Sequence, residues 1–186
     1  MKCHILPFAE PGAKIRLMFQ DEARFGRISD LAHCWCPKGV RPTVPKHLVR
    51  EYVYAYGAVD PVDGEDCFIT APYCNTEWTS EFLKILSEKF AKDYILLPTD
   101  NASWHKSKSL VIPDNIYIFY LPPYTPELNP IEQIWKEIRK DGFKNVLFQT
   151  LDKVEDKLCS SLVSLGEDVV KSVCGREWIV SMCIGN

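Results

Sequence analysis

IRLMFQDE, residues 15–22, is an apolar run that ends on acidic residues, the first of which is Asp21. A second run, YILLPTDN at residues 94–101, ends in a similar way on Asp100. Short apolar runs of this length are typical of buried strands. Both aspartates are therefore expected at strand ends, where a lone aspartate is usually an ordinary turn or capping residue.

A third acid, Glu132, closes the segment PPYTPELNPIE at residues 122–132, where a helix is expected to begin. A carboxylate on that helix and two at strand ends can converge on one point. Convergent carboxylates are oxygen ligands for a hard cation such as Mg²⁺, and a pair of such ions serves in-line cleavage of a phosphodiester. The pattern NPIE (129–132) also reads as a helix start, with Asn as N-cap, proline at N1 and glutamate closing a capping box. One carboxylate cannot fill both roles well, so the two interpretations compete.

The remaining elements alternate in a mixed α/β order. Strands are expected at residues 14–21, 52–59, 67–71, 94–99 and 116–120, with a short extra strand at 33–36 and a hairpin turn at 60–64. Helices are expected from Asn75 or Thr76 to about Phe90, at about 130–141, at about 151–165, and in the tail 167–186. Three antiparallel strands, a helix and two further strands alternating with helices make a mixed α/β plan. This order alone does not single out one fold.

The bulk properties limit the classes of protein to consider. A chain of 186 residues suits one domain with a hydrophobic core. No apolar run approaches the ~20 residues that a membrane span needs, and the first ten residues are too interrupted for a signal peptide. We therefore expect a cytoplasmic protein without membrane contact. The net charge of −3 argues against a strong general affinity for nucleic acid.

Eight cysteines are many, but their positions form no disulfide framework. His33, Cys34 and Cys36 have a spacing that zinc sites use, yet no second ligand pair follows at a usual distance. Buried or idle thiols are the default interpretation.

Three segments together resemble a known family: FQDE (19–22), DNASWH (100–105) and PPYTPELNPIEQIW (122–135). They look like the DDE endonuclease domain of Tc/mariner-type transposases, in particular of the bacterial insertion-sequence branch. The likeness runs from roughly residue 15 to residue 165, and the last segment is highly specific. One departure is that 31 residues lie between Asp100 and Glu132, a shorter interval than the family usually has, which indicates a trimmed loop.

The resemblance implies a ribonuclease H-like α/β fold, in which a mixed sheet of three antiparallel and two further strands is flanked by helices. It also implies that Asp21, Asp100 and Glu132 are catalytic and bind two Mg²⁺ or Mn²⁺ ions for DNA cleavage and strand transfer at transposon ends. Glu22 is a rival to Asp21. Because neighbours on a strand point to opposite faces, one of the two should face the site, and the motif selects Asp21.

Two more residues of the second motif, Asn101 and His105, are expected near the site. His105 either holds a carboxylate, contacts phosphate or caps a helix. Candidate DNA contacts come from two basic patches: Lys38 and Arg41 in the acid-free segment 31–50, and Lys136, Arg139 and Lys140 on the helix of Glu132. The alternative for the second patch is an ordinary solvated helix face.

Full-length members of the family carry helix-turn-helix modules upstream of the first acid, and here about 20 residues precede Asp21. We therefore expect a single catalytic domain over residues 1–186 without such a module. DNA is the expected partner, both as transposon ends and as target, and the chain is expected to be nucleoid-associated when bound. End recognition would come from a separate polypeptide or a homodimer, or would be lost.

Two rival functions stay open from the sequence. One is an inactive or domesticated remnant that binds nucleic acid or protein, which the short interval and the acidic balance favour. The other is a different ribonuclease H-like nuclease, such as a resolvase or an RNA-strand hydrolase.

Overall fold

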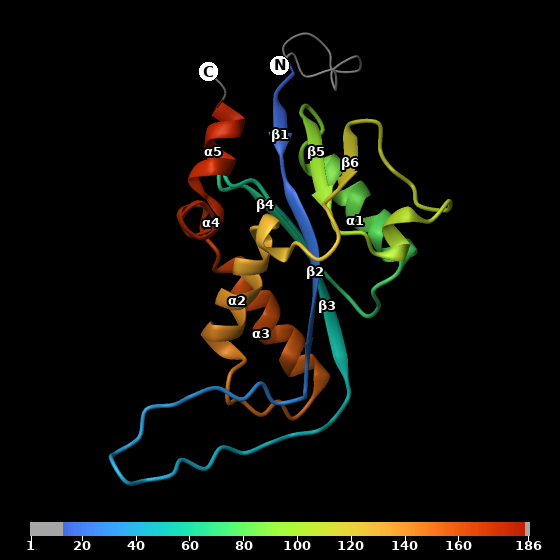
Figure 1. The fold of residues 1–186 in the computed structure, drawn as a ribbon. Helices are drawn as coiled ribbons and strands as arrows, with labels where there is room; N and C mark the ends of the chain where they lie inside the picture. Colours follow the sequence, from blue (N-terminus) through green and yellow to red (C-terminus); the bar gives the residue numbers. More distant parts are fainter. Residues whose placement is uncertain (1–12, 185–186) are drawn as a thin grey trace.

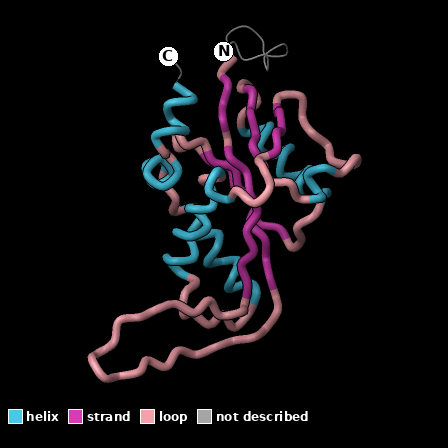
Figure 2. Tube along the Cα trace, in the orientation of Figure 1, coloured by secondary structure: helices cyan, strands magenta, loops and turns pink. Residues whose placement is uncertain are grey.

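The computed structural model describes residues 13–184 (Figures 1 and 2). In chain order its elements are β1 (Ile15–Leu17), β2 (Phe19–Gly26), β3 (Tyr52–Val59), β4 (Asp66–Ala71), α1 (Thr76–Lys89), β5 (Tyr94–Thr99), the 3₁₀ turn η1 (Ser103–Lys106), β6 (Ile116–Tyr120), η2 (Pro126–Leu128), α2 (Ile131–Gly142), α3 (Leu151–Val163), α4 (Glu167–Cys174) and α5 (Glu177–Ile184).

One nearly continuous stretch, β1 followed by β2, joins two three-stranded sheets. β2 pairs antiparallel with β3, which pairs antiparallel with β4. β1 pairs parallel with β5, which pairs parallel with β6. Met18 separates β1 from β2, and its amide still donates to the carbonyl of Leu96 at 3.0 Å. The result is the predicted mixed sheet of three antiparallel strands followed by two further strands.

Helices bury the two faces of this sheet in separate clusters. On one face Phe19, Ala23 and Phe25 of β2 pack with Trp135 of α2, and the cluster extends through α3, α4 and α5. On the other face Met18 packs with residues of β3 to β6 and with α1. Figure 1 shows α2 and α3 on one side of the strands and α1 on the other. The period of two along β2 therefore assigns its odd-numbered side chains to the α2 side.

Most predicted elements are confirmed at or within a few residues of the expected bounds. The strands at 52–59, 94–99 and 116–120 lie where they were predicted. Asn75 is the N-cap of α1, and its side chain accepts from the amide of Trp78 at 2.9 Å. The first strand continues to Gly26 because β3 pairs with it as far as Tyr52.

The extra strand predicted at 33–36 is wrong. These residues lie exposed in the long irregular segment between β2 and β3, which extends away from the helices and sheets in Figure 2. A strand needs a neighbour to accept and donate its main-chain hydrogen bonds, and residues 33–36 pair with no strand of the described chain. Among residues 13–184, no helix has the length and apolar character to cross a membrane.

Ion pairs of the Arg16 side chain join the two sheets near the start of β1. The guanidinium of Arg16 on β1 contacts Asp93, which precedes β5, and lies 3.0 Å from Asp63 and 3.4 Å from Asp60 in the β3–β4 turn. The Arg16 side chain is only 10% exposed. It therefore ties the central strand to both sheets.

We predict that Arg16→Ala lowers the free energy of unfolding by about 3–5 kcal/mol, because it leaves several part-buried carboxylates without their cation. Lys153→Ala is the matched control. Lys153 pairs with Asp156 at 3.3 Å, but both side chains are about 70% and 68% exposed, so its loss should cost less than ~0.5 kcal/mol. Urea unfolding of both variants measures the difference, and equal losses would contradict a structural role for Arg16.

Candidate active site: three acids in one pocket

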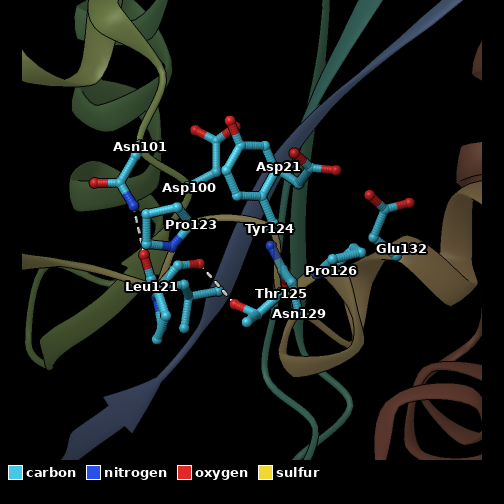
Figure 3. Close-up of a pocket in the computed structure, with 11 residues that line it drawn as sticks. Asp21, Asp100, Asn101, Leu121, Pro123, Tyr124, Thr125, Pro126, Asn129 and Glu132 are labelled. Atoms are coloured by element: carbon cyan, nitrogen blue, oxygen red, sulfur yellow. Dashed lines mark hydrogen bonds between the residues drawn. The ribbon is translucent and has the colours of Figure 1, made fainter.

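The three predicted acids line one pocket. Asp21 comes from β2, Asp100 directly follows β5, and Glu132 lies in the first turn of α2. The pocket has a volume of about 370 Å³, and Figure 3 shows all three carboxylates around it. The other lining residues are Asn101, Leu121, Pro122, Pro123, Tyr124, Thr125, Pro126 and Asn129. The structure therefore brings together residues that are up to 111 positions apart in the sequence.

Asp21 points towards α2 because it shares the face of Phe19 and Ala23 on β2. Its Oδ2 accepts a hydrogen bond from the indole Nε1 of Trp135 at 2.9 Å. Burial, followed by the charges of Glu22 and Glu132, raises the pKa of Asp21 from an ordinary 3.8 to about 8, although the Trp135 bond opposes that shift. A cation bound in the pocket would offset the cost of ionising Asp21 and so oppose the rise in its pKa.

Glu132 does not form the alternative capping box. The N-cap position of α2 is Pro130, and no side chain caps it. The side chain of Asn129, which is 5% exposed, instead donates to the main-chain carbonyl of Gln20 at 2.8 Å. No described residue forms a hydrogen bond with the Glu132 carboxylate. Glu132 is therefore available to the pocket.

Glu22 lies on the opposite face of β2 from Asp21, as the strand period predicts. It accepts from Gln20 Nε2 at 3.0 Å and lies 3.3 Å from His105 Nε2. His105 is buried, and the same nitrogen lies 3.5 Å from Oδ1 of Asp100. Of the three roles considered for His105, contact with carboxylates is the one that this geometry favours.

Asn101 lines the pocket, and its amide nitrogen donates to the carbonyl of Leu121. Its Oδ1 accepts from Lys106 Nζ at 2.5 Å. Lys106 was not predicted, because a lysine after DNASWH has no distinctive local pattern. It places an exposed cation beside the acidic pocket.

The donor set fits a hard cation, because three carboxylates face one pocket. Buried side-chain atoms without a hydrogen-bond partner among the described residues include Gln20 Oε1, His105 Nδ1 and Asn129 Oδ1, all on residues that contact the site. Buried polar groups of this kind are normally bonded by protein, ordered water or an ion. Within residues 13–184, no three His, Cys, Asp or Glu side chains are gathered closely enough to hold a metal as they stand. Repulsion between like charges is a physical reason for the separation, and convergence around two ions stays a prediction.

The thiols Cys34 and Cys36 are exposed and unpaired, and Cys36 Sγ approaches the carbonyl of Val40 at 3.1 Å. The idle-thiol interpretation stays a prediction.

The basic residues predicted to contact DNA differ in their exposure and in the contacts that they make within the chain. Lys38 and Arg41 are exposed in the long segment between β2 and β3, and Lys136 is exposed on α2. Lys140 pairs with Glu137 at 3.3 Å. Arg139 donates to the carbonyl of Arg24 at 3.2 Å and lies over the ring of Phe25, so it packs α2 against β2.

The comparisons with known proteins identify the family of this chain. Residues 16–155 match the model of the DDE superfamily endonuclease family, and the chain belongs to that family. The uncharacterized protein y4pE/y4sA of Sinorhizobium fredii (strain NBRC 101917 / NGR234) is 34% identical over 130 residues, which are 68% of this chain and 96% of that protein.

Similar solved structures are complexes of the Mos1 mariner transposase. The paired-end complex with Mn has a TM-score of 0.65 at 12% identity and covers 86% of this chain and 52% of that one. The pre-cleavage transpososome gives 0.64 at 12% identity, covering 92% and 56%. The paired-end complex with the left transposon end gives 0.63 at 14% identity, covering 86% and 51%. The ribonuclease H-like fold is therefore confirmed, and the chain spans about half the length of these structures.

The raised pKa of Asp21 predicts how stability depends on pH without divalent metal. Between about pH 4 and pH 8 the folded chain keeps a proton on Asp21 that the unfolded chain has lost, so the free energy of unfolding falls as pH rises and levels off above about 8. Asp21→Asn removes this titration and keeps an acceptor for Trp135. The variant should lose less stability across that window and melt higher than the wild type at pH 8. Asp156→Asn, at an exposed position, is the control, and equal pH slopes for all three proteins would refute the assignment.

Proposed function

We propose that this chain is the catalytic domain of a DDE transposase, which cleaves DNA at transposon ends and transfers the cut strand to target DNA. The observation that carries the proposal is that Asp21, Asp100 and Glu132, each in a family motif, line one pocket. The shares of the Mos1 complexes that the chain covers support the role of one catalytic domain. The proposal includes residues 1–186 as a single domain, with end recognition from a separate polypeptide or a second copy of the chain.

In this proposal Asp21, Asp100 and Glu132 hold two Mg²⁺ or Mn²⁺ ions, and complexes of Mos1 with Mn and with Mg are among the similar structures. When bound, such a pair supplies Lewis-acid activation of the attacking oxygen and stabilisation of the leaving oxygen. The chain itself orients the ligands. Trp135 holds Oδ2 of Asp21 through its indole N–H. His105 restrains Asp100, because its Nε2 lies 3.5 Å from Oδ1 of that carboxylate.

DNA would be positioned by contacts to phosphate. Three basic side chains are exposed and can contact the phosphates of a DNA backbone: Lys38, Arg41 and Lys136. Lys140 can exchange its exposed partner Glu137 for phosphate, since a surface ion pair of this kind contributes little. Arg139 would act mainly by holding α2, and its contacts to β2 fix the helix that carries Glu132.

We predict metal-dependent nicking of supercoiled plasmid by the full chain in Mn²⁺, lost on Asp21→Ala, Asp100→Ala or Glu132→Ala because each removes a ligand of the ion pair. Millimolar Mn²⁺ should also raise the melting temperature of the wild type by mass action, and raise it less in these variants. Asp114→Ala, an acid outside the pocket, is the control. DNA binding without cleavage and without a metal-induced shift would favour the remnant that only binds nucleic acid. Selective cleavage of RNA–DNA hybrids or branched DNA would favour the other nuclease.

We also predict that duplex DNA is bound weakly, with little sequence preference and with an affinity that falls steeply as salt rises, because the candidate contacts go to phosphate. Lys38→Ala with Arg41→Ala, or Lys136→Ala with Lys140→Ala, should weaken binding to all sequences alike. Lys153→Ala, at an exposed lysine outside the pocket, is the control. Fluorescence anisotropy at two salt concentrations measures the effect, and tight binding of one sequence that salt does not weaken would reveal an unrecognised reading element.

A further inference from the structure

Tyr124 is the most unusual residue of the pocket. The residue is 99% exposed although it lines the pocket, and its backbone has φ 62°. In the view of Figure 3 its ring is seen between the carboxylates of Asp100 and Asp21. A bulky residue is rarely found in this left-handed region, which favours glycine. Local strain of this kind clusters at ligand clamps and active sites.

The loop around Tyr124 is built to hold this conformation. Three prolines, Pro122, Pro123 and Pro126, restrict the backbone on both sides. Thr125 Oγ1 closes the turn by donating to the carbonyl of Pro122 at 2.6 Å. Just before the turn, the amide of Leu121 donates to the carbonyl of Thr99 at 2.8 Å, which anchors the loop next to Asp100. An aromatic ring is thus presented to solvent at the pocket from a restrained backbone.

We propose that Tyr124 is a base-stacking residue, whose ring covers one face of an unpaired nucleobase next to the phosphate that the three acids act on. This inference rests on the proposed function. A phosphodiester at the carboxylates places the bases of its own and neighbouring nucleotides at the edge of the pocket, where the ring stands. Bases inside a duplex are covered on both faces, so the ligand is a base that is frayed, flipped out or at a strand end.

A cation on the neighbouring side of the pocket fits the same nucleotide. Lys106 is exposed, holds Asn101 Oδ1 at 2.5 Å and lies 5.0 Å from the ring centroid of Tyr120. Tyr120 is itself 42% exposed at the end of β6. An aromatic platform and a nearby cation are what single-stranded nucleic acid requires, because the ring takes the base and the cation takes the phosphate. The stacking face is chemically indifferent to base identity, so we expect little sequence preference.

Binding of the full chain to two DNA probes tests this inference, with Ca²⁺ present as the hard cation. One probe is a duplex with a short single-stranded overhang that carries 2-aminopurine, a fluorescent base, at successive positions; the other is the same duplex without the overhang. The variants are Tyr124→Ala, Tyr124→Gly and Tyr124→Phe. Tyr117→Ala is the matched control, because Tyr117 is 55% exposed near the start of β6, whereas the pocket lies beyond the end of that strand.

Loss of stacking should weaken binding of the overhang probe about tenfold in Tyr124→Ala and Tyr124→Gly, with little change for the blunt duplex. The 2-aminopurine quenching seen with the wild type at one position should disappear in both variants. Tyr124→Phe and Tyr117→Ala should stay within about twofold of the wild type. Tyr124→Gly should melt no lower than the wild type, since glycine accepts the positive φ, which separates lost binding from lost folding.

A second measurement changes the DNA probe rather than the protein. Replacing the quenched base by an abasic nucleotide should weaken wild-type binding by the same factor, and should then make the wild type and Tyr124→Ala equal. If the Tyr124 variants bind and quench like the wild type while Mn²⁺-dependent nicking persists, the stacking role is refuted and the proposed function stands. If the wild type neither binds nor nicks DNA, both are refuted.

Discussion

The main-chain hydrogen bonds of one strand path, Ile15 to Gly26, set the position of Asp21 relative to Asp100. The first part of this path pairs with β5 and the second with β3, and the Met18 amide keeps the connection to β5 between them. Asp21 therefore has a fixed relation to the end of β5, where Asp100 follows. Because the side-chain direction alternates along the strand, Asp21 faces α2 and Glu22 faces η1. A shift of one residue in register would exchange these two acids.

Holding several carboxylates together costs free energy, and the surroundings offset that cost in specific ways. The indole of Trp135 donates to Asp21. His105 lies between Glu22 and Asp100. α2 is held in place by the Trp135 bond and by the Asn129 amide on the Gln20 carbonyl, and both contacts fix the approach of Glu132. Burial of Asp21, followed by the repulsion from Glu22 and Glu132, still raises its pKa, as expected where a protein gives up stability for function.

Local sequence patterns predicted the parts of the fold that local physics decides. β3, β5 and β6 are apolar runs with clear ends, and Asn75 caps α1 as its side-chain chemistry requires. The failures are tertiary. The local pattern NPIE taken alone indicates a capping box, the alternative to a ligand role for Glu132, but the Asn129 side chain donates instead to Gln20, 109 residues away. An extended segment at 33–36 has strand-like residues but no partner among the described strands.

In the site, too, local sequence patterns predicted some features, and others depend on tertiary contacts. The motifs predicted which acids line the pocket. The strand period predicted that only one of Asp21 and Glu22 would face it, and the motif selected Asp21. The contact of the Trp135 indole with Asp21 was not predicted, although a buried indole N–H needs an acceptor and so could have indicated a polar neighbour. Lys106 and Tyr124 gave no local signal, because exposure at a pocket follows only from the position of β6 and its loop relative to β5.

The short proline-rich loop between β6 and α2 connects these observations. Prolines reduce the number of conformations of the unfolded chain, so holding such a loop in one shape costs less entropy than holding a flexible one. The loop makes few core contacts, and its lining residues are largely exposed. Its restraint must therefore come from its own backbone, from the Thr125 turn and from the Asn129 anchor at its end. Carboxylates that repel one another tend to open a site. A stiff connection between Tyr124 and Glu132 resists that opening without neutralising the charge, so the pocket can stay shaped for a cation and its substrate before either one binds.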